Sequence, residues 1–163
     1  MSKSRDEIAK KYRFGLLLSY ITVGYNVIEG IISVIIGTAT GSVALVGFGL
    51  DSFIESLSGS VMVWRLSKHG KISHEEEERV EEKAANLVGV TFLILAAYVL
   101  YEAVKSLLES EPATPSLFGI VIAVLSLIVM TGLSYLKNKT GKEIWSHSIV
   151  ADSTQTIICV LMS

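Results

Sequence analysis

The sequence predicts an all-α protein that folds as a polytopic transmembrane helical bundle. Half of the 163 residues are hydrophobic and the mean hydropathy is +0.53, well above the usual mix of a soluble protein. Charged residues make up only 18% of the chain, and they collect in short blocks between long apolar runs. Five of these runs reach the roughly 20 residues that a helix needs to cross a ~30 Å hydrocarbon core. The chain is therefore predicted to be an integral membrane protein.

The ends of the predicted spans are marked by residues that interrupt or begin helices. Pro112 and Pro115 both fall in the connection between the third and fourth spans, where a missing backbone N–H costs no helical hydrogen bond. After the second span, Ser73 and Glu76 match a capping box, which predicts a helix start there. The five predicted spans cover approximately residues 14–37, 42–64, 84–108, 116–136 and 144–163.

Basic residues outside the spans lie on one side of the predicted membrane only. The two loops on the opposite side, 38–41 and 109–114, contain no Lys or Arg. Because cytoplasmic loops are enriched in these residues, the N-terminus is predicted to be cytoplasmic. The residues that give this orientation are Lys3, Arg5, Lys10, Lys11, Arg13, Arg65, Lys68, Lys71, Arg79, Lys83, Lys137, Lys139 and Lys142.

The chain stops at Ser163 within apolar sequence, without a basic anchor or a polar tail. An odd fifth span that ends in this way indicates a missing continuation, and a sixth helix is expected after it. The expected fold is therefore a single transmembrane domain with five of six spans present.

Three of the spans carry polar residues at three- and four-residue steps, which places them on one face of each helix. An ionisable group inside a span costs roughly 2.5–3.5 kcal/mol on insertion scales, so these faces are predicted to point into the bundle. The stripes are Ser19, Thr22, Asn26, Glu29 and Ser33 in the first span, Asp51, Glu55, Ser58 and Met62 in the second, and Ser148, Asp152, Gln155, Cys159 and Met162 in the fifth. The third and fourth spans show no comparable stripe.

The depths of the acidic residues in the second and fifth spans can be compared through the helical rise of ~1.5 Å per residue. Counted from the predicted ends of the spans, Asp51 comes level with Gln155, and Glu55 comes level with Asp152. These matched depths predict a polar layer near the middle of the membrane.

This layer is a candidate metal site. Asp51 and Glu55, at i and i+4, would repel each other if both were ionised and unpaired, and a bound divalent cation removes that repulsion. Asp152 adds a third carboxylate, Gln155 an amide and Cys159 a thiolate. Such a mixture of oxygen donors with one sulfur suits Zn²⁺ or a neighbouring first-row ion. Protons can replace the metal when it leaves, which predicts proton-for-metal exchange.

Each candidate ligand also has a purely structural interpretation. Asp51 and Glu55 are alternatively a buried polar pair that fixes helix packing. Gln155 is alternatively a hydrogen-bond partner across helices, and Cys159 a small packing residue.

The first span adds Glu29, with Asn26 close to it on the same face. Glu29 and Asn26 are candidates for a proton carrier or for groups that hold the metal ligands by hydrogen bonds. Glu29 is alternatively a structural partner of Asn26.

Two segments resemble the motifs of a known family. Residues Gly47–Glu55, GFGLDSFIE, resemble the second-helix motif of the cation diffusion facilitator (cation efflux) family, in which a small-residue stretch leads into His or Asp, three further residues and an Asp. Residues Ala151–Cys159, ADSTQTIIC, are similar to the fifth-helix motif of that family, where the same pair of ligands usually follows Ala-Asp. Helix order, the charged loop after the second helix and the cytoplasmic start extend the resemblance over essentially the whole chain.

The resemblance implies that Asp51 and Glu55 are the second-helix ligands, and that Gln155 and Cys159 are the fifth-helix pair. The chain departs from the family pattern because Glu replaces Asp at 55, and Gln and Cys replace His and Asp in the fifth helix. Asp152 shares the face of that pair and can supply the missing charge. Many family members carry a large cytosolic metal-binding domain, so the resemblance implies a short branch of the family without it.

The leading prediction is a secondary transporter that exports a divalent metal from the cytosol by proton antiport, as a homodimer in the membrane. Zn²⁺ is favoured over Mn²⁺, Fe²⁺, Co²⁺ and Cd²⁺. One alternative is a small proton-coupled multidrug exporter with Glu29 as its essential carboxylate, and another is a non-transporting metal-binding membrane protein. No enzymatic activity and no prosthetic group are predicted, because the chain has no nucleophile–base pairing and no phosphate loop. The net charge of −2 gives no support for nucleic-acid binding.

Overall fold

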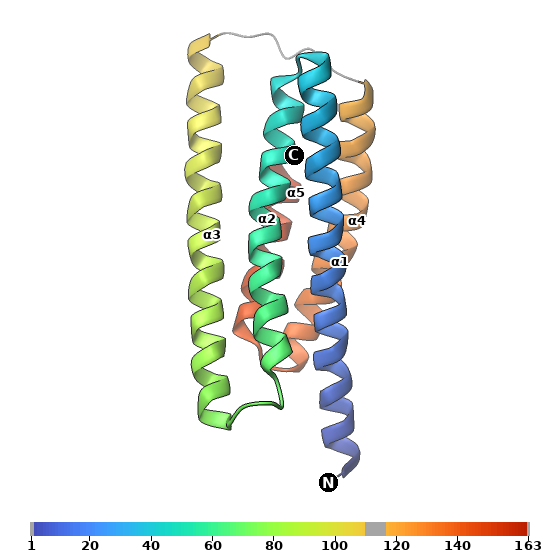
Figure 1. Ribbon diagram of the computed structural model, residues 1–163, viewed down its shortest axis with the longest axis vertical. Helices are drawn as coiled ribbons and strands as arrows, with labels where there is room; N and C mark the ends of the chain where they lie inside the picture. Colours follow the sequence, from blue (N-terminus) through green and yellow to red (C-terminus); the bar gives the residue numbers. More distant parts are fainter. Residues whose placement is uncertain (1, 110–116, 163) are drawn as a thin grey trace.

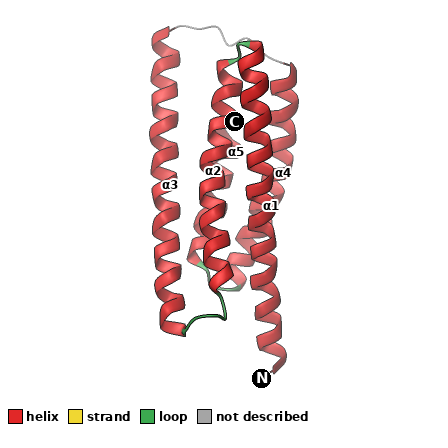
Figure 2. Cartoon of the chain, in the orientation of Figure 1, coloured by secondary structure: helices red, strands yellow, loops and turns green. Residues whose placement is uncertain are grey.

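Helices account for nearly all of the structure, a computed structural model that describes residues 2–109 and 117–162. Within these residues the chain forms five α-helices and no strand (Figure 2). The helices are α1 (Ser2–Thr40), α2 (Val43–Lys68), α3 (His74–Glu109), α4 (Leu117–Glu143) and α5 (His147–Met162). The all-α fold predicted from the sequence is confirmed.

Each predicted span overlaps one helix, with differences at the ends. By length and apolar composition, Asp6–Thr40 of α1 and the whole of α4 are each able to cross a membrane. The predicted fifth span began at residue 144, but α5 begins at His147. Trp145 has a positive φ of 55° between the two helices, and Ser146 then caps α5 by accepting a hydrogen bond from the Ile149 amide at 3.4 Å. Residue 163 and the sixth helix expected after it lie outside the described residues.

The helices run alternately up and down the bundle, so that the N-terminus, the turn at 69–73 and the turn at 144–146 lie at one end (Figure 1). This end is called the N-terminal end below. The turn at 41–42 lies at the opposite end. α1 packs most extensively along α2, while α3 stands at the side and contacts α2 and α5. The basic residues predicted to share one side of the membrane therefore gather at the N-terminal end, except Lys137, which is buried in the bundle.

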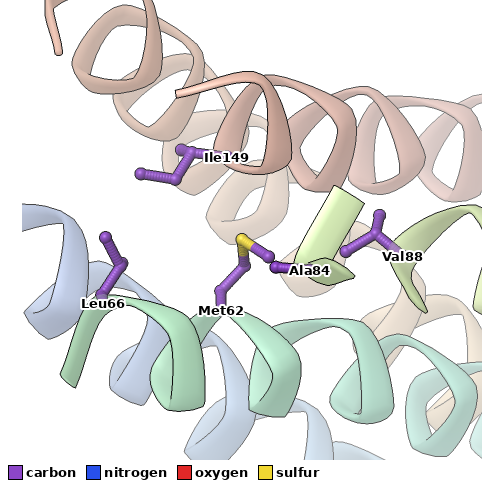
Figure 3. Packing of buried hydrophobic residues seen from close by; sticks show 5 residues of the cluster. All are labelled: Met62, Leu66, Ala84, Val88 and Ile149. Atoms are coloured by element: carbon purple, nitrogen blue, oxygen red, sulfur yellow. The ribbon is translucent and has the colours of Figure 1, made fainter. Parts of the chain in front are cut away.

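Two apolar clusters fill the bundle between the helices. The first lies toward the N-terminal end between α2, α3 and α5, and it consists of Met62, Leu66, Ala84, Val88 and Ile149 (Figure 3). The second joins α1 to α4 and consists of Leu18, Met130 and Leu133. Many other large apolar side chains are exposed on the outside, such as Leu93 and Ile128, as suits a surface that faces lipid.

The polar stripes predicted on three helices face the interior of the bundle. The buried members are Ser19, Thr22, Asn26, Glu29 and Ser33 on α1, Glu55, Ser58 and Met62 on α2, and Ser148, Asp152, Gln155 and Cys159 on α5. Asp51 is partly buried, and the side chain of Met162 lies outside the described residues. The prediction from the helical spacing is thus confirmed for the described side chains.

A polar network joins α1, α2, α3 and α5 at the N-terminal end. The buried Arg65 forms an ion pair with Glu81. The Glu81 carboxylate also accepts hydrogen bonds from the Ser146 hydroxyl at 2.9 Å and from the Ser148 amide at 2.8 Å. The guanidinium carbon of Arg65 lies 5.1 Å from the ring centroid of Tyr12, within cation–π distance. These contacts join the four helices at the N-terminal end of the bundle.

The capping box predicted at the start of α3 is present. The Ser73 hydroxyl accepts a hydrogen bond from the Glu76 amide at 3.3 Å, and the Glu76 carboxylate accepts one from the Ser73 amide at 3.1 Å. The hydrogen bonds that the Ser73 amide and hydroxyl donate to the Glu76 carboxylate hold the pKa of this exposed carboxyl below its usual value.

Two glycines let α1 and α2 approach closely at the level where both helices carry acidic residues. A Cβ atom added at Gly49 would lie 2.8 Å from the carbonyl oxygen of Gly30, and one added at Gly30 would lie 3.0 Å from the carbonyl oxygen of Gly49. The clash is with backbone, which cannot move aside as a side chain can. Small residues at this crossing therefore determine the distance between Glu29 and the α2 residues opposite it.

We expect Gly49→Ala to destabilise the bundle by about 1–3 kcal/mol, the usual cost of inserting an atom into a well-packed contact. Gly24→Ala is the matched control, because a Cβ there meets no atom within 4 Å. The control should be neutral, or more stable by about 0.5–1 kcal/mol through its helix propensity. Thermal unfolding of both variants in detergent measures the difference. Equal stability of the two variants would show that the close approach does not hold the helices together.

Candidate metal centre

A small cavity lies inside the bundle between α1, α2, α4 and α5, with room for an occupant of about the size of a water molecule. Its apolar walls come from Phe48, Leu127, Met130 and Val160. Its polar lining consists of Glu29, Asp51, Ser52, Glu55, Ser126 and Cys159. The cavity thus brings together side chains from the first, second and fifth predicted spans.

Three carboxylates line this cavity. Glu29 and Glu55 are each only 6% exposed, and Asp51 is partly buried. One oxygen of each carboxylate has no hydrogen-bond partner among the described residues, namely Oε1 of Glu29, Oδ1 of Asp51 and Oε1 of Glu55. Buried polar atoms are nearly always paired, and unpaired ones often mark a site for an ion or water. Three oxygens around one cavity thus lack a partner that a cation or a proton could supply.

The close crossing of α1 and α2 positions the carboxylate of Glu29. Gly30, the next residue, lies against Gly49, and this contact places Glu29 opposite Ser52. The Ser52 hydroxyl donates a hydrogen bond to Oε2 of Glu29 at 3.0 Å, which leaves Oε1 for another partner. Ser52 thus contributes a hydrogen bond as well as a small side chain at this crossing.

The fifth helix sits about one turn away from its predicted register. Oδ1 of Asp152 accepts a hydrogen bond from the Ser58 hydroxyl at 2.6 Å. Asp152 therefore lies level with Ser58, and the predicted match with Glu55 is wrong by three residues, or ~4.5 Å. The cause is the start of α5 at His147, because the turn at 144–146 takes up three residues that the prediction counted as helix.

The shift in register changes which α5 side chains reach the α2 carboxylates. Cys159 lines the cavity together with Asp51 and Glu55. Asp152 and Gln155 are not among the lining residues. This register places Cys159 in the cavity with the carboxylates of α2. It leaves Asp152 and Gln155 outside the cavity.

Asp152 and Gln155 have other partners in this structure. Oδ2 of Asp152 forms an ion pair with Nζ of Lys137 at 2.8 Å, and both side chains are 1% exposed. Oε1 of Gln155 accepts a hydrogen bond from the Thr91 hydroxyl at 3.1 Å, while its Nε2 has no partner among the described residues. Asn26 is fully buried outside the cavity, and neither side-chain amide atom has a partner in the described part of the chain.

The fourth helix contributes more than its sequence indicated. Ser126 lines the cavity, and Ser134, Lys137 and Thr140 are buried at three-residue steps further along the same helix. Only Ser126 and Ser134 of these residues lie within the predicted fourth span, 116–136, for which no polar stripe is predicted. The stripe arises because α4 extends to Glu143 and so includes Lys137 and Thr140.

The side chains are not arranged as a finished metal site. Among the side chains that the structure describes, no three of His, Cys, Asp or Glu lie close enough together to hold one ion. Glu29, Asp51, Glu55 and Cys159 share the cavity, but they must move toward its centre to coordinate the same cation.

The comparisons with known proteins point to one family. A family model for the cation efflux transmembrane domain matches residues 19–163. Transmembrane protein 163 of Xenopus laevis is 24% identical over 157 residues, which cover 94% of this chain and 54% of that protein. An uncharacterized transporter of Synechocystis sp. is 27% identical over 118 residues, which cover 70% of this chain and 38% of that protein.

A third relative is the magnetosome protein MamB of Magnetospira sp., which is 21% identical over 138 residues that cover 82% of this chain and 46% of that protein. The chain spans about half the length of these relatives, or less. No solved structure matches it.

Proposed function

This chain belongs to the cation efflux family, and we propose that it is a secondary transporter of divalent metal cations that binds its substrate in the cavity between α1, α2, α4 and α5. The metal leaves the cytosol in exchange for protons. The N-terminal end of the bundle faces the cytoplasm, because the Lys and Arg residues other than Lys105 and the buried Lys137 gather there. The functional unit is a homodimer in the membrane.

The observation that carries the proposal is the set of unpaired oxygens of Glu29, Asp51 and Glu55 around one cavity. Carboxylates inside a membrane protein repel one another and lose their hydration. A divalent cation compensates their charge and supplies the missing partner for each unpaired oxygen. Protons do the same when the metal has left, which couples the two species at one site.

The donors favour Zn²⁺ or a neighbouring first-row ion. Asp51 and Glu55 supply hard oxygen ligands, and Cys159 supplies a soft sulfur ligand once it is deprotonated by the metal. Purely oxygen-based sites suit Mg²⁺, Ca²⁺ or Mn²⁺ better, so the thiolate shifts the preference toward Zn²⁺ and Cd²⁺. Glu29 is the proton carrier of the site, held in place by Ser52.

Two further predicted ligands need a change of partner before they can bind metal. Asp152 must release Lys137, and Oε1 of Gln155 must release the Thr91 hydroxyl. Their ligation stays a prediction, whereas Asp51, Glu55 and Cys159 need only to move toward the centre of the cavity that they already line.

Transport into sealed vesicles tests this function. With the purified protein reconstituted, Zn²⁺ uptake should require an opposing proton gradient, and each metal ion taken up should be matched by proton release on the other side. Metal binding should weaken as the pH falls, because protons compete for the carboxylates. A metal-sensitive dye inside the vesicles and a pH dye outside measure both fluxes. Zn²⁺ uptake that persists unchanged after the pH gradient is collapsed would contradict proton antiport while leaving the metal site intact.

A further inference from the structure

The ion pair between Lys137 of α4 and Asp152 of α5 is buried in the bundle next to the cavity. Nζ of Lys137 lies 2.8 Å from Oδ2 of Asp152, and each side chain is only 1% exposed. The Ser58 hydroxyl donates a hydrogen bond to the other carboxylate oxygen at 2.6 Å. Both oxygens of Asp152 are therefore occupied, and the ammonium of Lys137 is the cation that neutralises it.

This pair lies one helical turn from the cavity, in the direction of the N-terminal end. Ser58 is three residues after Glu55 on α2, and α2 runs toward that end. Lys137 and Asp152 are both near enough to Glu55 to act on its charge. A series of carboxylates thus runs from the cavity toward the N-terminal end, in the order Asp51, Glu55 and Asp152. The ammonium of Lys137 pairs with Asp152, the last of them.

Stability alone does not explain this pair. Removing two charges from water costs several kcal/mol per ion, and replacing a buried ion pair by apolar residues of similar volume is often neutral or stabilising. Ionisable residues inside membrane proteins accordingly tend to mark ion or proton pathways. The long and flexible lysine side chain can also change partner, because it holds its charge as a compact ammonium at the end of four methylene groups.

We propose that Lys137 is a tethered cation that occupies Asp152 in place of the transported metal, so that Asp152 is a second cation-binding position on the transport path. The proposal rests on the proposed function of the cavity. A metal ion that moves between Glu55 and Asp152 displaces the ammonium, and Lys137 moves to the carboxylate that the metal has left. Glu55 and Asp152 then each keep a cation during the exchange.

A double-mutant cycle with Zn²⁺ as the probe tests the proposal on the purified full chain. Lys137→Gln frees Asp152 for the metal, so Zn²⁺ should bind roughly tenfold more tightly. Asp152→Asn leaves Lys137 without its partner, and the ammonium then competes for Glu55, so Zn²⁺ should bind roughly tenfold more weakly. The double variant Lys137→Gln/Asp152→Asn should return to within about threefold of the wild-type affinity. Lys139→Gln, an exposed lysine on the same helix, is the matched control and should change nothing.

The affinities of the two single variants distinguish this proposal from a purely structural pair and from a permanent ligand, and the transport rate of the double variant distinguishes it from a charge effect on the cavity alone. If the pair only stabilises the fold, both single variants lower the melting temperature and neither changes the Zn²⁺ affinity, which overturns the proposal. If Asp152 is a permanent ligand, the double variant stays as weak as Asp152→Asn, which overturns it as well. Wild-type protein that binds no Zn²⁺ would instead refute the proposed function itself.

Vesicle transport provides a second measurement if a single variant does not fold. The double variant carries no buried charge at this position and keeps the cavity carboxylates, so it should bind Zn²⁺ normally. Its transport rate should nevertheless fall at least roughly tenfold, because the second position on the path is lost. Transport at the wild-type rate by the double variant would overturn the proposal.

Discussion

Asp51→Ala is expected to weaken Zn²⁺ binding by roughly 100-fold or more. Loss of a group that only hydrogen-bonds to a metal ligand typically lowers the metal affinity about 10–100-fold, and loss of the ligand itself should lower it further. The substitution removes one of the three carboxylates that line the cavity and leaves Glu55 as the last carboxylate of the i, i+4 pair. The two remaining carboxylates come from different helices. Isothermal titration of the purified protein with Zn²⁺ measures the loss directly.

Asp6→Ala is the matched control for this prediction, since Asp6 is an exposed residue near the start of α1, far along the chain from the cavity. Its affinity should equal that of the wild type. If Asp51→Ala also binds Zn²⁺ as the wild type does, the cavity is not the metal site. Glu29 as the carboxylate of a proton-coupled multidrug exporter would then be the better account, and transport of an organic cation by the vesicles would test it.

Cys159→Ser is expected to change the selectivity among metals. The hydroxyl keeps the size and polarity of the side chain but removes the soft donor from the cavity. Because thiolate prefers softer ions, affinities for Zn²⁺ and Cd²⁺ should fall at least roughly tenfold more than the affinity for Mn²⁺. Titrations with the three ions give the ratio, and Mn²⁺ serves as the internal control.

The same variant has a spectroscopic signature. Cys159 is the only cysteine in the chain, so any thiolate-to-Cd²⁺ absorption band of the wild type must come from it and must vanish in Cys159→Ser. Equal weakening for all three ions, with no band in the wild type, would mean that Cys159 only packs between the helices.

The spacing of polar residues predicted the interior faces of α1, α2 and α5 correctly. Glu29 on α1 and Glu55 on α2 are both buried, as their three- and four-residue steps implied. The physical reason is local: the helical period places these residues on one face, and the cost of exposing them to lipid turns that face inward. Such a prediction needs no knowledge of which helix lies opposite.

The partners of these residues depend on the tertiary structure. The left-handed conformation of Trp145 delays the start of α5 and brings Cys159, rather than Asp152, into the cavity with Glu55. The packing of α4 against α5 then gives Asp152 a lysine as its partner. A sequence therefore determines which face of each helix is polar, because that depends on a period within one segment. The choice of partners across helices depends on turn geometry and helix register. A shift of three residues moves a side chain by ~4.5 Å along the helix axis, which is enough to place it opposite different residues of the neighbouring helix.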